Sequence, residues 1–245
     1  DAAHSLGTTW RGRRIGTIGR AGCFSFQSYK LVNAGEGGIL ITDDADLVAR
    51  AIIMSGAYEH NWAKHMTGPD AALDAAFARW QNRLPLYNLR LSNLSAAIVR
   101  AQLPEIPARV RAGRANHDRV AALLDTSPNL SVPPPLDGEV RAPDSIQFNL
   151  VGLSDEECRD FADGAAARGV KVQVFGQSAD NARAFWNWGF LPRGTPDLPR
   201  TRSMLMRACD VRLPARLSRA ECDAVADILL AAMAEVTEAR RAYGT

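Results

Sequence analysis

The sequence predicts an α/β protein in two parts, an N-terminal part over residues 1–110 and a C-terminal α+β domain over residues 111–245. Two patterns support this division. A β-branched run at residues 37–42 precedes a capped helical pattern, and residues 145–175 read as strand, helix and strand. Residues 126–144 are rich in Pro, Asp and Ser, so we expect them to form a connecting loop.

The composition is that of an ordinary globular protein. The chain has 245 residues, 47% of them hydrophobic and 23% charged, with a formal net charge of +2. This balance gives no electrostatic reason to expect nucleic acid or a membrane surface as a partner, and no apolar run is long enough for a membrane span. The widely spaced Cys23, Cys158, Cys209 and Cys222 indicate reduced thiols in the cytoplasm. No histidine lies at metal-ligand spacing from a cysteine, so no metal site is expected.

The first part should alternate short strands with helices. We expect strands or turns at 15–19 and 23–26, a buried strand at 37–42, an irregular loop at 57–72 and a short helix at 71–80. Asp43 or Asp44 can cap a helix after the buried strand, because apolar residues follow at helical spacing: Leu47, Val48, Ala51 and Ile52.

Two more helices are expected around a pair of prolines. Residues 92–103 have helical apolar spacing, with Ser92 or Asn93 as the cap. Pro104 and Pro107 should interrupt this helix. Pro107 also suits the first turn of a second helix over residues 107–124.

The last hundred residues read as a compact α+β pattern. We expect strands at 145–151, 170–175 and 203–208. Ser154 and Glu157 form a capping-box sequence for a helix over 155–168, and Gly169 should end it. Ser218 and Glu221 repeat that pattern at the start of a final amphipathic helix.

The stretch that says most about a possible active site is residues 23–38, CFSFQSYKLVNAGEGG. A lone lysine is usually a solvated surface residue, but Lys30 lies between an apolar run and a Gly-rich turn. A phosphate-binding P-loop is excluded, because here the glycines follow the lysine. A desolvated lysine amine can instead form an imine with an aldehyde cofactor such as pyridoxal 5′-phosphate (PLP). PLP would also need a carboxylate for its ring nitrogen and a phosphate site of hydroxyl and backbone N–H groups.

Two further clusters are weak by themselves. The N-terminal Asp1-Ala-Ala-His4 contains an acid and a histidine, and a single histidine is more often structural than catalytic. Residues 87–93, YNLRLSN, read most simply as a loop that ends in a helix cap.

In order and spacing, the three clusters together resemble the DegT/DnrJ/EryC1/StrS family of PLP-dependent enzymes, most of which are sugar aminotransferases. The resemblance rests on Asp1–His4, Phe24–Phe26, Lys30, the Gly35-Glu-Gly-Gly38 turn followed by Thr42-Asp43, and the run from Asn88 to Ala97. The order and spacing of these motifs match the family over roughly the first hundred residues. It implies the PLP-dependent transferase fold type I, with the C-terminal part of the large α/β/α domain followed by a small α+β domain.

The resemblance also implies roles for single residues. Lys30 would hold PLP as a Schiff base and act as the general base, and Asp1 would pair with the pyridine nitrogen. His4 would lie near the ring hydroxyl, and Ser25 would bind the cofactor phosphate. Asn88 would reach the phosphate in the neighbouring subunit, which implies a homodimer with shared active sites.

The implied reaction is transamination from an amino acid, commonly glutamate, to a keto substrate such as a nucleotide-linked keto sugar. Another PLP reaction, elimination or cyclisation, remains open, as does a non-catalytic assembly module. Two departures from the family bear on this. The chain begins at the DAAH motif, without the segment that precedes it in the family, so we expect weak or absent PLP binding by this chain alone. Residues 57–86, with Trp62, His65 and Trp80, resemble an insertion and favour a substrate that is not a nucleotide-linked sugar.

Overall fold

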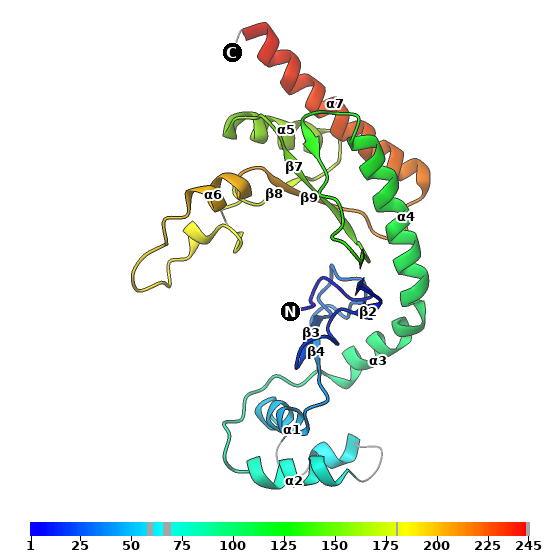
Figure 1. The fold of residues 1–245 in the computed structure, drawn as a ribbon, viewed down its shortest axis with the longest axis vertical. Helices are drawn as coiled ribbons and strands as arrows, with labels where there is room; N and C mark the ends of the chain where they lie inside the picture. The colour runs from blue at the N-terminus through cyan, green and yellow to red at the C-terminus, as the bar shows by residue number, and fades with distance from the viewer. Residues whose placement is uncertain (58–60, 66–69, 180, 244–245) are drawn as a thin grey trace. The chain divides into compact units, whose positions relative to one another are not determined.

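The computed structural model describes residues 1–57, 61–65, 70–179 and 181–243. The chain divides into two compact units (Figure 1). The first contains Asp1–Pro107 together with Asp137–Arg141, and the second contains Ala108–Leu136 together with Ala142–Thr245. None of the described helices is long and apolar enough to cross a membrane.

A small antiparallel sheet in the first unit joins distant parts of the sequence. Strands β1 (Thr9–Trp10), β2 (Arg13–Arg14) and β6 (Glu139–Val140) pair in the order β2-β1-β6. The Trp10 indole N–H donates to the carbonyl of Asp137 at 3.1 Å. The expected loop at 126–144 therefore contains β6, and it also contains β5 (Leu130–Ser131), a strand of the second unit.

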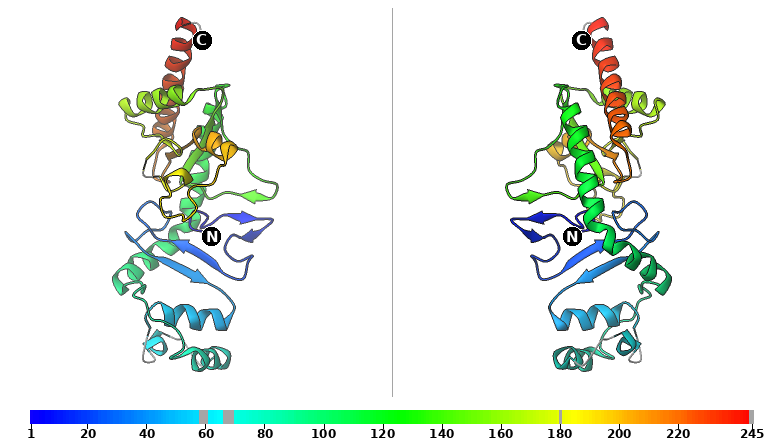
Figure 2. Two further views of the ribbon diagram at one scale, coloured as in Figure 1. Left: turned by 90° about the vertical axis from the view of Figure 1, so that its left-hand side faces the viewer. Right: turned by 90° about the vertical axis from the view of Figure 1, so that its right-hand side faces the viewer.

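The hairpin of β3 (Gly22–Ser25) and β4 (Gly38–Ile41) is the main strand pair of the first unit (Figure 2). The strand expected at 37–42 exists, but the prediction that it is buried was wrong. Ile39 and Leu40 are 49% and 39% exposed. Within the described structure β4 pairs with β3 alone, so its apolar side chains remain accessible to solvent.

The helices α1 (Ala45–Met54) and α2 (Ala71–Trp80) form a small packed pair. Asp44 caps α1, because its carboxylate accepts a hydrogen bond from Leu47 N at 3.0 Å. That bond and the Arg20 guanidinium lower the pKa of Asp44. Trp62 lies in a 3₁₀ turn, η1 (Asn61–His65), and stacks on Phe77 with ring centroids 3.8 Å apart.

Helix 71–80 is confirmed, whereas the irregular loop expected at 57–72 contains the 3₁₀ turn η1. The remainder of that expectation, at residues 58–60 and 66–69, lies outside the described residues.

The proline pair acts as expected. Helix α3 (Asn93–Gln102) ends in a short 3₁₀ turn, η2 (Leu103–Glu105), and α4 (Ile106–Leu124) follows. Ser92 caps α3 through its hydroxyl, which accepts from Ser95 N at 3.0 Å. Because Pro104 and Pro107 lack backbone N–H groups, they lie at first-turn positions where no intrahelical donor is needed.

The second unit is built on an antiparallel sheet in the order β5-β7-β9-β8. Its other strands are β7 (Ser145–Leu150), β8 (Gln173–Val174) and β9 (Ala208–Arg212), and its helices include α5 (Asp155–Ala167) and α7 (Arg219–Tyr243). The prediction of a strand at 203–208 was wrong. Helix α6 (Pro199–Leu205), with proline at its first position, occupies most of that range. The strand begins only at Ala208, where Cys209 and Val211 alternate into the core.

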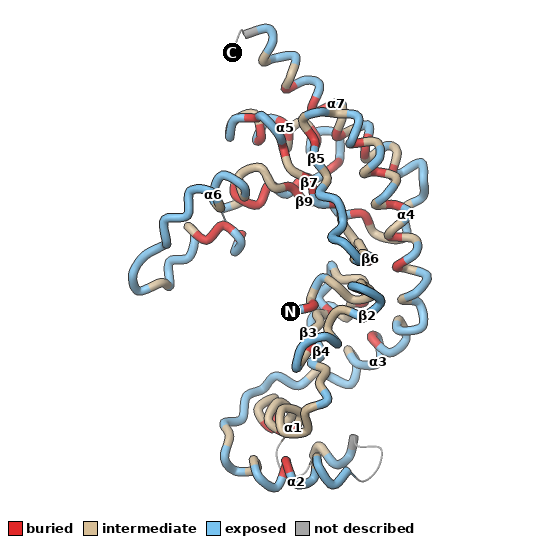
Figure 3. The backbone as a smooth tube through the Cα atoms, in the orientation of Figure 1, coloured by how far each residue is buried: buried red, intermediate tan, exposed pale blue. Residues whose placement is uncertain are grey.

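The core of the second unit is one large apolar cluster. The red stretches of Figure 3 mark buried residues along its strands and helices. The strand expected at 170–175 contributes Val170, Val172 and Val174 to this core, although only Gln173–Val174 form strand β8. Large fully buried side chains from the sheet and helices fill the rest: Leu124, Ile146, Phe148, Leu150, Phe161, Leu213 and Leu229.

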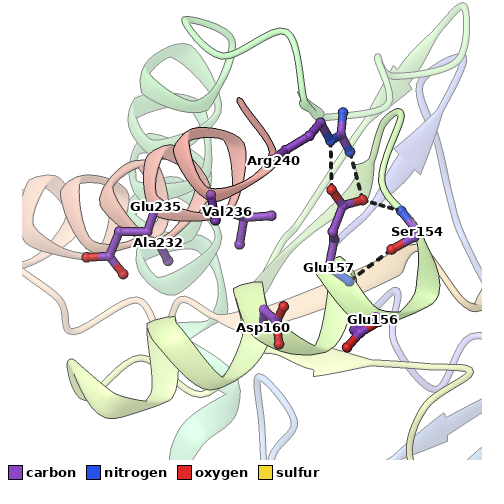
Figure 4. Close-up of a pocket in the computed structure, with 9 residues that line it drawn as sticks. Ser154, Glu156, Glu157, Asp160, Ala232, Glu235, Val236 and Arg240 are labelled. Atoms are coloured by element: carbon purple, nitrogen blue, oxygen red, sulfur yellow. Dashed lines mark hydrogen bonds and ion pairs between the residues drawn. The ribbon is translucent and has the colours of Figure 1, made fainter. Parts of the chain in front are cut away.

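Glu157 joins α5 to α7 (Figure 4). Its carboxylate accepts two hydrogen bonds from the Arg240 guanidinium, both at 2.7 Å. It also accepts the Ser154 N–H at 2.6 Å and completes the predicted capping box. The Arg240 guanidinium and the Ser154 N–H together lower the pKa of Glu157 to about 2.

We predict that Glu157→Gln destabilises the protein by about 1 kcal/mol at pH 7, because it weakens the cap and removes the charge opposite Arg240. A depressed folded-state pKa gives stability that is present above the ordinary value of 4.5 and lost as the pH falls towards 2. The gap between wild-type and variant urea midpoints should therefore narrow from pH 7 to pH 3.

The second capping box provides the control. Glu221 accepts hydrogen bonds from Ser218 but forms no ion pair with an arginine within the described residues. Glu221→Gln should therefore show a smaller gap at pH 7. Equal gaps for the two variants at both pH values would contradict the role given to Arg240.

Candidate functional site

Strand β3 fixes the N-terminal segment in place. The Ala2 N–H donates to the carbonyl of Cys23 at 2.8 Å, and Ala2 is 1% exposed. A tight turn follows, in which the Asp1 carboxylate accepts the Ala3 N–H at 2.9 Å. The DAAH cluster therefore lies beside the strand that leads to Lys30.

The segment between β3 and β4 is a closed loop that carries Lys30. Phe26 N donates to Gly37 O and Ser28 N donates to Gly35 O, both at 2.8 Å. Gly37 has a φ of +138°, in the region that favours glycine. A Cβ on Gly38 would lie 2.7 Å from the carbonyl oxygen of Phe24. The glycines of the GEGG turn are thus needed for the backbone path that returns from Lys30 to β4.

A small apolar cluster anchors this loop. Phe26 and Val32, on either side of Lys30, are 4% and 0% exposed and pack with Val99 of α3. Leu6, from the segment that follows the DAAH cluster, packs against the same cluster. Apolar burial therefore holds three separate segments of the sequence together around the lysine.

Gln102 adds a polar clamp from α3. Its Oε1 accepts the Asn33 N–H at 3.3 Å, and its Nε2 donates to the Asn33 carbonyl at 2.6 Å. Gln102 was not among the residues predicted from the sequence. Gln102 lies three positions after Val99, so helical spacing places both on one face of α3. This spacing could have indicated that Gln102 faces the Lys30 loop together with Val99.

The Lys30 amine lies against the His4 imidazole. The distance from Lys30 Nζ to His4 Nε2 is 2.6 Å, which is a hydrogen bond. An ammonium group can only donate, so a charged Lys30 requires Nε2 of His4 to be the acceptor. Lys30 is half-buried and His4 is exposed. The imidazole therefore orients the lysine amine.

Ser25 and Asn88 are placed by different elements. Ser25 is the last residue of β3, and its Oγ accepts the Gln27 N–H at 3.2 Å. Asn88 lies in an extended segment beside the end of α1, where Tyr87 N donates to Met54 O and Leu89 N to Ser55 O, both at 2.9 Å. The Asn88 side chain is exposed and forms no hydrogen bond within the described part of the chain. The structure thus brings His4 to Lys30 and places the turn of Asp1 and the residue Ser25 on strand β3, whereas Asn88 lies in a separate segment beside α1.

The chain is similar to known proteins over most of its length. The model of the DegT/DnrJ/EryC1/StrS aminotransferase family matches residues 1–230. The 3-amino-5-hydroxybenzoate synthase of Amycolatopsis mediterranei (strain S699) is 27% identical over 193 residues, which are 77% of this chain and 46% of that protein. The L-glutamine:scyllo-inosose aminotransferase of Streptomyces griseus is 55% identical over 51 residues, or 21% of this chain and 12% of that protein.

A solved structure shows the fold. The PLP-form of Spr1654 from Streptococcus pneumoniae matches with a TM-score of 0.75 at 19% identity, over 96% of this chain and 57% of that chain. This likeness confirms the expected PLP-dependent transferase fold type I. The chain spans about half the length of the Amycolatopsis relative, which it matches over most of its own residues.

We predict that Gln102→Ala loosens the Lys30 loop. Loss of two hydrogen bonds to the Asn33 backbone should cost about 1 kcal/mol, so the amides from Lys30 to Asn33 should exchange about fivefold faster with deuterium. Arg100→Ala, an exposed change on the same helix, is the control and should leave these rates unchanged. Unaltered exchange in Gln102→Ala would show that the apolar cluster alone holds the loop.

Proposed function

The chain belongs to the DegT/DnrJ/EryC1/StrS aminotransferase family, and we propose on this basis that it acts as a PLP-dependent aminotransferase. It would move an amino group from an amino acid donor to a keto substrate. The observation that carries this proposal is the hydrogen bond between Lys30 and His4, in a loop held by β3 and α3.

The side chains of the hairpin fit PLP. Lys30 offers an amine to the cofactor aldehyde, and Asp1 offers a carboxylate to the ring nitrogen. Ser25 offers a hydroxyl to the phosphate, beside the backbone N–H of Gln27. His4 offers a ring nitrogen near the lysine. The aldehyde, ring nitrogen and phosphate of PLP therefore each have a partner of suitable chemistry on one strand hairpin and its neighbouring turn.

When bound, PLP takes up the electron pair released as a proton leaves the amine-bearing carbon of the substrate. Residues of the chain would hold the cofactor and move the proton. Lys30 would hold the cofactor and, once its amine is released, would carry the proton from the amine-bearing carbon of the substrate to the former aldehyde carbon of the cofactor. His4 orients that amine through the 2.6 Å hydrogen bond. Asp1 holds the proton at the ring nitrogen.

The names of the relatives support a cyclic keto substrate. One is named for transfer from glutamine to scyllo-inosose, a cyclic ketone. We therefore propose a keto sugar or keto cyclitol as acceptor and glutamate or glutamine as donor. The second candidate is another PLP reaction, such as elimination. It is favoured by the relative named a synthase, which matches 77% of this chain. Release of ammonia or water without amine transfer would select it.

A homodimer with shared sites is part of the proposal. The stretch from residue 86 to 103 exposes several large apolar side chains beside Asn88: Leu86, Tyr87, Leu89, Leu94, Ile98 and Leu103. An apolar surface of this kind favours association. Asn88 would then contact the cofactor phosphate of the partner subunit. All four cysteines are free, which supports a cytoplasmic location.

We predict that Lys30→Ala reduces amine transfer by the full-length protein at least about a thousandfold, because both the covalent anchor and the proton carrier are lost. Transfer is measured as keto acid formed from the amino donor. Lys171→Ala, a change at an exposed lysine, is the matched control and should retain wild-type activity. Full activity in Lys30→Ala would exclude the proposed role.

Shared sites predict that two inactive variants rescue each other. Lys30→Ala and Asn88→Ala should each be impaired alone. After the two are mixed and subunits exchange, half of the dimers are mixed, and one of their two sites has both residues intact. Activity should therefore return to about a quarter of the wild-type value. If mixing restores nothing while light scattering detects mixed dimers, Asn88 does not act across the interface.

A further inference from the structure

The second unit has a groove between two helices that the proposed reaction does not use. It lies between residues 154–160, at the start of α5, and residues 232–240 of α7, and it encloses a cavity of about 730 Å³ (Figure 4). We call it the α5–α7 groove. Packed protein interiors leave few voids larger than a water molecule, so a space of this size is open to an external occupant.

Ion pairs fix the two walls of the groove. At one end, Glu157 accepts two hydrogen bonds from the Arg240 guanidinium, both at 2.7 Å. Towards the other end, Arg168 pairs with Glu235 and donates to the carbonyl of Gly164 at 2.8 Å. The walls are therefore in place before a partner arrives, which lowers the entropy cost of binding.

Short apolar side chains of α7 form part of the lining. Ala232, Val236 and Ala239 line the groove at intervals of four and three positions, which places them on one face of the helix. Ala232 and Val236 are 1% and 7% exposed, whereas Ala239 is exposed. Because these side chains are short, the backbone of another helix can approach α7 closely along this stripe.

The lining also carries negative charge that nothing compensates. It contains four carboxylates and one guanidinium, although the whole chain has a net charge of +2. Glu156 and Asp160 are exposed, and neither forms an ion pair with a described residue. The helix dipole explains an acid in the first turn of α5, such as Glu156, but not Asp160 in the second turn. Like charges four positions apart on a helix repel, so a cation beside them is favourable.

The combination of charge and apolar surface determines the kind of occupant. Among the described residues, no group of three or more His, Cys, Asp or Glu side chains could hold a metal ion. A small cation would also leave the apolar stripe of α7 uncovered. An amphipathic helix satisfies both features. Its apolar stripe covers Val236 and Ala239, and its lysine or arginine side chains reach Glu156 and Asp160.

We propose that the α5–α7 groove docks a basic amphipathic helix of a partner protein. The partner helix lies along α7, with its apolar side chains in the groove and its cationic side chains against α5. This interaction goes beyond amine transfer and depends on neither Lys30 nor PLP.

Fluorescence anisotropy with the full-length protein tests the proposal. The probe is a labelled helical peptide of lysine, leucine and alanine, with its leucines in one stripe. A scrambled peptide of the same composition, with leucines spread around the helix, should bind at least about tenfold more weakly. If the two peptides bind equally well, simple charge attraction explains the binding and the proposal is overturned. Failure of the striped peptide to bind overturns it as well.

A pair of substitutions on α7 locates the binding surface. Ala239→Arg fills the groove and adds positive charge, so it should weaken binding of the striped peptide at least about tenfold. Arginine is a good helix former, so α7 should remain intact. Ala234→Arg is the matched control, because Ala234 is exposed on the same helix and does not line the groove. Equal losses in the two variants would contradict docking in the groove.

A second pair tests the charges of α5. Asp160→Asn should weaken binding of the striped peptide about threefold, the effect expected of one exposed charge pair. Asp163→Asn should not weaken it, because Asp163 is exposed on the same helix but does not line the groove. Identical affinities of the two variants would contradict the role given to Asp160.

Two further measurements distinguish this inference from other interpretations. The mass measured by light scattering should be the same for the wild type and Ala239→Arg. A lower mass in the variant would mean that a second copy of this chain fills the groove, which overturns the proposal. Lys30→Ala should lose amine transfer and keep its affinity for the striped peptide. A wild type that binds this peptide in the groove but transfers no amine would refute the aminotransferase proposal alone.

Discussion

The 2.6 Å hydrogen bond between Lys30 Nζ and His4 Nε2 exists because two backbone segments are fixed beside the same strand. Ala2 donates to the Cys23 carbonyl of β3 and brings the N-terminal turn to the hairpin. Phe26 and Val32 fasten the lysine loop to Val99 of α3. Neither side chain would meet the other without these backbone and apolar contacts. The chemistry proposed for the lysine therefore rests on the packing of β3 and α3.

The two units differ in how completely they bury their apolar residues. The second unit has a continuous core of strands and helices, in which Phe148 and Phe161 are almost fully buried. The first unit has smaller clusters and exposes Ile39, Leu89 and Leu94. An exposed apolar surface costs free energy in water and favours association. The proposed homodimer gives a physical reason for the surface around Asn88.

Local features could be predicted from the sequence because their physics is local. The caps at Asp44, Ser92 and Ser154 depend on residues within three positions, and all three are present. The family resemblance, based on motif order, also led to the correct fold. Pairings between distant residues could not be predicted in this way. The joining of β1 to β6 and the bond from Gln102 to Asn33 depend on tertiary packing.

Two failed expectations have a common cause. The burial expected of 37–42 and the strand expected at 203–208 were both inferred from apolar composition. Ile39 is exposed because β4 has one described neighbour, and Leu205 ends a helix that Pro199 begins. Composition indicates what a segment can do, but neighbouring strands and an initiating proline decide what it does. Composition alone also could not assign a role to Lys30. Only the order of the motifs around it indicated a cofactor lysine.

The central claim is that Lys30 is the residue that holds PLP. The most direct test is to incubate the full-length protein with PLP, reduce it with borohydride and map the attached pyridoxyl group by mass spectrometry. The account predicts attachment at Lys30, with Lys64 and Lys171 unmodified. Attachment mainly at Lys64 or Lys171, or no attachment at any lysine under saturating PLP, would contradict it.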